Sequence, residues 1–385
     1  MEKKIAIVAP HRSMNYGTML QAYALAKVIN NLGYPCEYLS YSIYYKHSIY
    51  ERIWNKLKRI CGCASKGAVK NKGVDDISFS FSAELNPLLK KADYFYVNFI
   101  PHSSMLYNPK NVWKANFKYS KFIVGSDQSW SIENYIHEKA FYFLSFVPGY
   151  KKKYAYAPSI GTTRIPEQYK HILSKNLSSF RALSCREKSN SETLSGLLNR
   201  EVKYVVDPTL LIRKEEWGNF SEKVNELPPK YILAYILGEK KCVADFAERM
   251  AVQKGIPVYY VLTRPTYLSK PHILKTLSPQ QWIYAIANAD CVVTDSFHGT
   301  LFSINFNKEF YSFAKRKNDT SIEYNDNDRI VELLGSLNLE DRFIKDEDVE
   351  NDSLVRSEMS YEKVNEIVGN QRKESLNYLY KILHD

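Results

Sequence analysis

Residues 295–300, Asp-Ser-Phe-His-Gly-Thr, have the residue types best suited to chemistry on an anion. They follow an apolar run at residues 291–294, expected to be a strand, and they precede an apolar run from Leu301 with helical character. Unpaired amides in the first turn of a helix favour a bound anion by roughly 0.3 to 1 kcal/mol. A protonated His298 adds positive charge and can donate a proton. The alternative is that these polar residues only cap a helix and that His298 lies in the cleft with its hydrogen bonds made within the protein, without a ligand.

Cationic residues follow two further expected strands. Arg186, with Glu187 beside it, comes directly after the apolar run at residues 182–185, and Lys-Arg-Lys at residues 315–317 follows the run at residues 310–313. A guanidinium at a strand end suits a bidentate grip on a carboxylate or phosphate. Surface ion pairs and solvated lysines are the alternative reading of both clusters.

Residues 125–130, Gly-Ser-Asp-Gln-Ser-Trp, offer hydroxyls, a carboxylate, an amide and an indole, which are the groups that recognise a sugar. Alternatively, Asp127 caps a helix and Trp130 belongs to the core. No glycine-rich dinucleotide or P-loop motif is present, and no metal cluster stands out. The close cysteine pair Cys61 and Cys63 lacks the spacing of common zinc sites, so we expect reduced thiols and no metal.

The helices and strands that would position these residues have the pattern of an α/β fold. An apolar run at residues 5–9, a helical pattern ending at Gly33 and a second run at residues 36–41 form a βαβ unit, which predicts a parallel sheet. Short apolar runs recur at residues 122–124 and 153–157, each followed by small or charged residues. Such positions are carboxyl ends of strands, the edge at which open α/β sheets bind ligands.

A second domain is expected after the two prolines at residues 228–229. A new strand–helix–strand series begins at Tyr231, and the pair Ser278 and Gln281 predicts a capping box that opens a helix running to about residue 289. The amphipathic tail at residues 361–384 predicts a last helix, which by analogy would cross back to the first domain.

The composition of the chain limits the classes of binding partner but does not identify one of them. The formal charge of +11 and the 14% aromatic content suit nucleic acid, an anionic membrane surface, or anionic substrates and sugars. Residues 46–72 carry eight Lys or Arg against the single Glu51 and predict a basic amphipathic helix, either solvated or docked on anionic headgroups. Because no signal peptide or membrane span is apparent, we expect a cytoplasmic protein, with peripheral contact at the inner membrane face through residues 46–72.

Four short blocks together resemble the polysaccharide pyruvyl transferase family. Their order and spread cover residues 5–315, and as a set they are specific although each block alone is weak. The blocks are Asn15-Tyr16-Gly17-Thr18-Met19-Leu20-Gln21, Val124-Gly125-Ser126-Asp127-Gln128-Ser129-Trp130, Arg186-Glu187 and Thr294-Asp295-Ser296-Phe297-His298-Gly299-Thr300.

The resemblance implies an α/β fold similar to GT-B glycosyltransferases, with two Rossmann-like domains and a cleft between them. The domains would be an acceptor side at 1–226, a donor side at 227–355 and a crossing helix at 356–385. The implied reaction moves the pyruvyl group of phosphoenolpyruvate onto two hydroxyls of a sugar in a surface polysaccharide or its precursor, which forms a cyclic ketal and releases phosphate. The implied partners are a sugar or lipid-linked oligosaccharide, with no nucleic acid and no cofactor beyond the donor substrate.

The same resemblance assigns roles to residues. His298 would be the general acid or the phosphate partner, Arg186 would bind the donor's carboxylate or phosphate, and Asp127 or Glu187 would be the base or an acceptor contact. The other implied donor-binding residues are Ser296, Gly299, Thr300, Lys315 and Arg316, and the other implied acceptor-binding residues are Asn15, Tyr16, Gly17, Ser126, Gln128 and Trp130.

Two departures from the family pattern affect these roles. Many relatives carry Arg beside the Ser of the histidine block where this chain has Phe297, so donor charge is expected from Lys315 or Arg316. Many also place Asp after the first glycine, where this chain has Thr18. Two other functions fit the sequence: a GT-B-like glycosyltransferase that uses a nucleotide sugar, and a non-catalytic carbohydrate-binding component of polysaccharide assembly.

Overall fold

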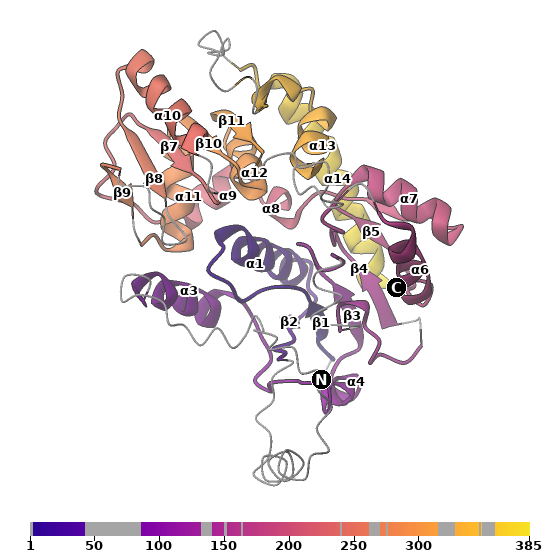
Figure 1. The fold of residues 1–385 in the computed structure, drawn as a ribbon. Helices are drawn as coiled ribbons and strands as arrows, with labels where there is room; N and C mark the ends of the chain where they lie inside the picture. Colours follow the sequence, from indigo (N-terminus) through magenta and orange to yellow (C-terminus); the bar gives the residue numbers. More distant parts are fainter. Residues whose placement is uncertain are drawn as a thin grey trace, which may run out of the picture.

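Two parallel β-sheets organise the molecule (Figure 1). The computed structural model describes residues 3–42, 86–131, 141–149, 152–162, 165–238, 241–261, 270–274, 276–314, 328–345, 348 and 359–385. Every pairing between the described strands is parallel, which confirms the α/β fold class expected from the sequence.

The first sheet has the strand order β2-β1-β3-β4. Its strands are β1 (Ile5–Val8), β2 (Cys36–Tyr38), β3 (Lys121–Val124) and β4 (Lys153–Ala155). The amide of Ala155 donates to the carbonyl of Ala182 at 3.1 Å, which joins β4 to the short pair β5 (Ser184–Cys185) and β6 (Lys203–Tyr204). All four residues of β1 are buried, because a parallel sheet is covered on both faces.

The second sheet has the strand order β12-β11-β10-β7-β8-β9. Its strands are β7 (Ile232–Tyr235), β8 (Val258–Val261), β9 (Ile273–Leu274), β10 (Cys291–Thr294), β11 (Glu309–Phe313) and β12 (Phe343–Ile344). Counted from β7, this is the doubly wound order of Rossmann folds, while the first sheet has the other common order, 2-1-3-4. In both, the chain order reverses between two central strands: β1 and β3 in the first sheet, β7 and β10 in the second.

Helices cover the faces of both sheets. They are α1 (Tyr16–Asn31), α3 (Asn86–Phe99), α4 (Ala115–Lys118), α6 (Glu167–Leu177), α7 (Lys188–Leu198), α8 (Pro208–Leu211), α9 (Lys214–Phe220), α10 (Lys241–Lys254), α11 (Pro279–Asn288), α12 (Phe297–Asn305), α13 (Asp328–Ser336) and α14 (Glu362–His384). The predicted capping box is confirmed, since Ser278 accepts from the amide of Gln281 and the Gln281 side chain accepts from that of Ser278. None of the described helices is both long and apolar enough to cross a membrane.

Helix α1 packs between the first sheet and the second domain (Figure 1). Eleven of its 16 residues are buried, so it has no broad solvent face. One hydrophobic cluster accordingly joins Ile7 of β1 and Leu25 of α1 to Leu233 of β7 and Ile283 of α11. The proposed boundary near residue 226 therefore separates two sheets that share a core.

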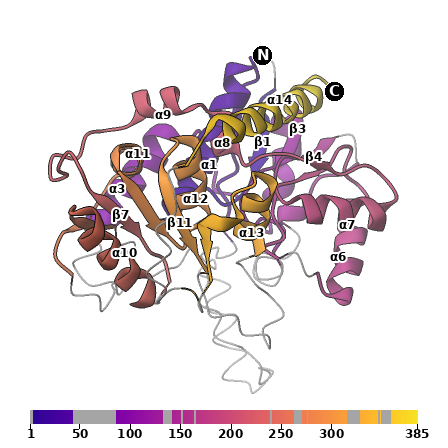
Figure 2. The ribbon, with the colours of Figure 1, turned by 90° about the horizontal axis from the view of Figure 1, so that it is seen from above.

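Helix α14 contacts both the domain of the first sheet and the domain of the second sheet (Figure 2). Before its first turn, the Tyr361 hydroxyl donates to the carbonyl of Lys308 in the second domain. Further along, Ser375 Oγ accepts from the amide of Val206 at 3.0 Å, and Tyr378 donates to the carbonyl of Ala155 on β4 at 2.9 Å. At its end, Lys121 Nζ donates to the carbonyl of Leu383 at 2.5 Å.

Candidate active site

The two points at which the strand order reverses face one another across a single pocket. In doubly wound sheets, ligands bind beyond the carboxyl ends of the strands at this reversal. Asn15 and Asp127 lie beyond β1 and β3, Leu237 and Ser296 lie beyond β7 and β10, and all four line the same pocket. Its volume of about 130 Å³ is several times the ~10–15 Å³ that one water molecule needs. The topology therefore locates a small-molecule site between the domains.

The turn from β10 into α12 is fixed by its own side chains. Thr294 Oγ1 donates to the carbonyl of Tyr235 on β7 at 2.7 Å and accepts from the amide of Ser296 at 3.1 Å. Ser296 is the N-cap of α12, and its hydroxyl accepts from the amide of Gly299 at 3.2 Å. In the described part of the chain, the amides of Phe297 and His298 have no such partner, so they are the two donors of this turn that an anion could use.

Gly299 and Thr300 shape this helix rather than line the pocket. A side chain at Gly299 would bring its Cβ to 2.5 Å from Thr294 Oγ1, so only glycine allows the close approach of α12 to β10. Thr300 is fully buried, and its hydroxyl lies 2.7 Å from that of Ser312 on β11.

The block at residues 15–17 meets the second domain. Asn15 caps α1 by accepting from the amide of Gly17 at 2.9 Å. Tyr16 is buried, stacks on Trp282 and donates its hydroxyl to the carbonyl of Leu277 at 3.1 Å. A Cβ on Gly17 would lie 2.2 Å from His298 Nδ1, so the absent side chain makes room for the histidine ring.

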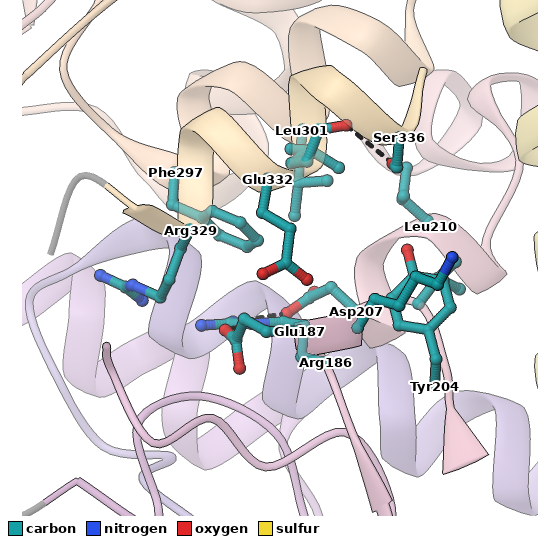
Figure 3. Close-up of a pocket in the computed structure, with 13 residues that line it drawn as sticks. Arg186, Glu187, Tyr204, Asp207, Leu210, Phe297, Leu301, Arg329, Glu332 and Ser336 are labelled. Carbon is teal, nitrogen blue, oxygen red and sulfur yellow. Dashed lines mark hydrogen bonds and ion pairs between the residues drawn. The ribbon is translucent and has the colours of Figure 1, made fainter. Parts of the chain in front are cut away.

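Asp207 is the centre of a buried charge cluster behind the pocket (Figure 3). Its Oδ2 accepts from Ser126 Oγ at 3.0 Å and from Arg186 Nη1 at 2.8 Å, and lies 3.6 Å from His298 Nε2. Its Oδ1 accepts from the amide of Thr209 at 3.0 Å. Burial alone would raise the pKa of Asp207, but His298, Arg186 and Thr209 outweigh it and hold that pKa well below its usual range.

Arg186 lies within this cluster and does not line the pocket. Only 5% exposed, it also donates through Nε to Glu187 Oε1 at 3.3 Å, and Glu187 accepts from Ser159 Oγ at 2.7 Å. Burial opposes the charge on Arg186, but Glu187 and Asp207 outweigh it and raise the guanidinium pKa. The side cavity beside it (Figure 3) measures about 20 Å³, space for one water.

Asp127 lies on the first domain's side of the pocket. Its φ of 68° is in the left-handed region, which Asp tolerates better than most residues. Thr18 Oγ1 donates to Asp127 Oδ2 at 2.8 Å, and the Asp127 carbonyl accepts from the amide of Ser159 at 2.7 Å. Thr18 therefore orients a carboxylate that comes from another strand end.

Two guanidinium groups lie over the ring of Phe297. Arg186 Cζ is 4.2 Å and Arg329 Cζ is 5.5 Å from the ring centroid. Arg329 comes from α13 and lines both the pocket and the side cavity (Figure 3). It brings positive charge to the pocket wall beside Phe297.

The structure brings together some of the predicted site residues. The pocket is lined by Asn15, Asp127, Gln128, Ser296 and His298, whereas Ser126, Arg186 and Glu187 lie behind it. Trp130 was expected to contact the acceptor but is fully buried, with its indole donating to the carbonyl of Tyr142 at 3.2 Å and stacking on Phe143. Tyr16 is likewise a core residue. Lys315, Arg316 and residues 46–72 lie outside the described residues.

Sequence reasoning missed two residues of the site. Asp207 directly follows the apolar run at residues 203–206, and the rule that polar residues at strand ends form the site could have selected it. Arg329 carried no such signal, because it lies on a helix, two residues into α13, rather than at a strand end.

Comparisons with known proteins cover nearly the whole chain. The model of the polysaccharide pyruvyl transferase family matches residues 15–315, a span that runs from Asn15 at the pocket through β10 and α12. A search of curated proteins found no match.

Several solved structures are similar in outline. UDP-N-acetylglucosamine 2-epimerase from Rickettsia bellii is 10% identical, with a TM-score of 0.47 over 99% of this chain and 97% of that chain. UDP-GlcNAc 2-epimerase from Neisseria meningitidis, bound to UDP-GlcNAc, is 11% identical, with a TM-score of 0.44 over 98% and 100%. Arabidopsis thaliana UGT89C1, complexed with quercetin, is 11% identical, with a TM-score of 0.40 over 99% and 94%.

Proposed function

Because the chain belongs to the polysaccharide pyruvyl transferase family, we propose that it transfers the pyruvyl group of phosphoenolpyruvate to two hydroxyls of a sugar, forming a cyclic ketal and releasing phosphate. The observation that carries this proposal is the position of His298. It lies in the first turn of α12, in a pocket that the strand ends of both sheets line, beside the buried carboxylate of Asp207. An acid in a site built for an anion is what this reaction requires.

In the proposed reaction, His298 protonates the methylene carbon of the donor and so creates an oxocarbenium-like centre. A first sugar hydroxyl adds to this centre and gives up its proton, the bond from carbon to the phosphate oxygen breaks, and a second hydroxyl adds to close the ketal. One of the two hydroxyl protons replaces the proton given by His298, and the other leaves with phosphate. General acid catalysis of this kind contributes about 10²- to 10⁴-fold to a rate.

Asp207 is proposed to position the acid. A carboxylate 3.6 Å from Nε2 favours the tautomer of His298 that carries a proton on that nitrogen. Nδ1 is then the nitrogen that exchanges a proton with the donor. Arg186 acts through Asp207, because a guanidinium already paired with two carboxylates offers the donor little further attraction.

Arg329 is proposed to hold the donor's phosphate or carboxylate together with the free amides of Phe297 and His298. The support is its place on the pocket wall and the charge that a planar guanidinium offers to an oxyanion. Asp127, which Thr18 orients at 2.8 Å, is proposed as the base or contact for the sugar hydroxyls. A lipid-linked acceptor, and membrane contact through residues 46–72, stay predictions.

The test is acceptor-dependent phosphate release from phosphoenolpyruvate with a panel of galactosides, glucosides and mannosides. We expect His298→Ala to lower kcat by at least about 10²-fold and Arg329→Ala chiefly to raise the KM for phosphoenolpyruvate. Arg249→Ala is the matched control, because its guanidinium lies 5.9 Å from the ring of Phe246 outside the pocket, and it should leave both constants unchanged.

Other results would replace the proposal. Release of nucleoside diphosphate from a nucleotide sugar, with no phosphate from phosphoenolpyruvate, would indicate a glycosyltransferase. Sugar binding that His298→Ala retains, with no turnover by either protein, would indicate a carbohydrate-binding component.

A further inference from the structure

A second cavity lies where α3 of the first domain meets the second domain beside α11 (Figure 1). Its volume of about 320 Å³ falls in the range of ~300–1,000 Å³ that small-molecule sites occupy. We call it the Lys91 pocket. Its described lining residues come from α3, β8, β9, α11 and the loops beside them, and none of these residues lines the active-site pocket.

Lys91 crosses between the domains and fixes the side chain of Gln281 in the wall of this pocket. Its ammonium donates to the carbonyl of Thr276 at 2.6 Å and to Gln281 Oε1 at 2.9 Å. The same oxygen accepts from the amide of Ser278 at 3.0 Å, within the capping box of α11. Both partners of this oxygen can only donate, so the Gln281 side chain has one orientation. In the described part of the chain its NH₂ group meets no acceptor, which leaves two donors for a ligand.

An aromatic pair forms another part of the wall. The rings of Tyr259 and His272 stack with their centroids 4.9 Å apart and their planes at 25°. His272 has a φ of 58°, in the left-handed region where histidine is enriched, and its carbonyl accepts from the amide of Tyr260 at 3.0 Å. Backbone bonding therefore holds the loop that carries the ring. Tyr259 is half-buried and His272 is exposed, so the pair can offer ring surface to a ligand.

These groups match the chemistry of a sugar ring. A pyranose has C–H groups on its faces, which pack on aromatic rings, and hydroxyls around its rim, each of which both donates and accepts. The NH₂ group of Gln281 and the third N–H of Lys91 suit hydroxyl oxygens, while the carboxylate of Glu226 on the pocket wall suits a hydroxyl hydrogen. A neutral sugar is favoured over an anion because the pocket offers this acceptor beside its donors.

We propose that the Lys91 pocket is a saccharide-binding site separate from the active-site pocket. The two pockets are neighbours: the carbonyl of Leu277, which lines the Lys91 pocket, accepts from the Tyr16 hydroxyl at 3.1 Å, and the adjacent Asn15 lines the active-site pocket. A bound sugar would contact both domains, since Lys91 belongs to the first and Gln281 to the second. The proposal concerns binding alone, so the phosphate-release assay does not decide it.

The experiment is isothermal titration calorimetry of the full chain with the methyl glycosides of galactose, glucose and mannose at millimolar concentrations. The variant Gln281→Glu keeps an acceptor for Ser278 and for Lys91, and so preserves the capping box, but it removes both NH₂ donors. We expect it to bind the glycoside at least about tenfold more weakly, with an unchanged urea midpoint that shows the fold to be intact.

Tyr259 supplies an independent pair of variants. Tyr259→Ala removes the aromatic surface and should also weaken binding at least about tenfold, whereas Tyr259→Phe keeps the ring and should retain most of the affinity. Tyr380→Ala is the matched control. That tyrosine also packs on a histidine, His384, with ring centroids 3.6 Å apart, but on α14 outside the pocket, so its loss should leave the affinity unchanged.

Nuclear magnetic resonance locates the bound sugar. The ring resonances of His272, assigned with His272→Gln, should shift when the glycoside is added, and Tyr259→Ala should abolish the shift. Three results would each overturn the proposal: no binding of any of the three glycosides, glycoside binding that Asp127→Asn abolishes and Gln281→Glu retains, and a His272 shift caused by inorganic phosphate but by no glycoside. The second would place the sugar in the active-site pocket, and the third would indicate an anion site.

Discussion

At the scale of single residues, the ring of His298 determines what may occupy position 17. The two residues in this close contact belong to different domains, since Gly17 is on α1 and His298 is on α12. A side chain at position 17 must displace the imidazole from Asp207, because a Cβ there would overlap the ring at 2.2 Å.

We therefore expect Gly17→Ala to lower kcat for phosphate release by about 10²-fold, the cost of a misplacement near 1 Å, while the protein still folds. Gly196→Ala on α7 is the matched control, since nothing lies within 4 Å of its added Cβ. That change should keep full activity and raise stability by up to about 1 kcal/mol. A fully active Gly17→Ala protein would show that the ring has room to move.

Asp207 links the site to acid stability. Its folded pKa is depressed, so the carboxylate stabilises the fold above its unfolded pKa, about 3.9, and this contribution is lost as the pH falls through the acid range below that value. We expect Asp207→Asn to cost roughly 3–5 kcal/mol at neutral pH and to flatten the acid dependence of urea unfolding. Asp93→Asn, at an exposed ion pair with Arg12, should cost under about 1 kcal/mol and leave the acid dependence intact. An unchanged acid slope in Asp207→Asn would contradict the assignment.

The sequence identified residues that carry a local signal. His298 follows a strand and opens a helix, and Asp127 follows another strand, so the strand-end rule was enough to select both. Trp130 shares its block with Asp127 yet points into the core, because the chain turns directly after a residue with positive φ. Sequence spacing does not encode that change of direction.

At the scale of elements, α12 presents the acid and depends on its cap. Ser296→Ala removes the acceptor for the Gly299 amide, and Ser278→Ala removes the equivalent acceptor for Gln281 on α11. We expect each change to cost about 1 kcal/mol in urea unfolding. Only Ser296→Ala should also lower kcat, because its helix begins next to His298. Equal loss of activity in the two variants would indicate a general effect of stability.

The elements predicted from the sequence were those with strong apolar periodicity or caps. The runs that became β1, β3, β7 and β10 are buried on both faces and are therefore mostly apolar, apart from Lys121 at the start of β3 and Thr294 at the end of β10. Helix α7 was not predicted, because only three of its 11 residues, two of them polar, are buried. Helix α13 follows a polar stretch and has two buried residues, so its role in the site depends on tertiary packing.

At the scale of the whole molecule, the shared core should make the domains unfold together. Multidomain proteins often unfold in separate steps, but one cluster here joins both domains through α1. We expect a single urea transition, with the same midpoint from far-UV circular dichroism and from tryptophan fluorescence. The emission that Trp130→Phe removes reports on the first domain, and the emission that Trp282→Phe removes reports on the second. Two separated midpoints would show that the interface contributes little.

The contact between Gly17 and His298 also bears on fidelity. Phosphoenolpyruvate held by the second domain alone would meet an acid with no wall behind its ring, since that wall is the first turn of α1. In the proposed reaction, water competes with the sugar hydroxyl for the activated carbon and would yield free pyruvate. Because that wall comes from the domain proposed to bind the sugar, the glycine at position 17 aligns the acid beside the acceptor's side of the pocket, which would favour transfer to a sugar hydroxyl over loss of the donor to water.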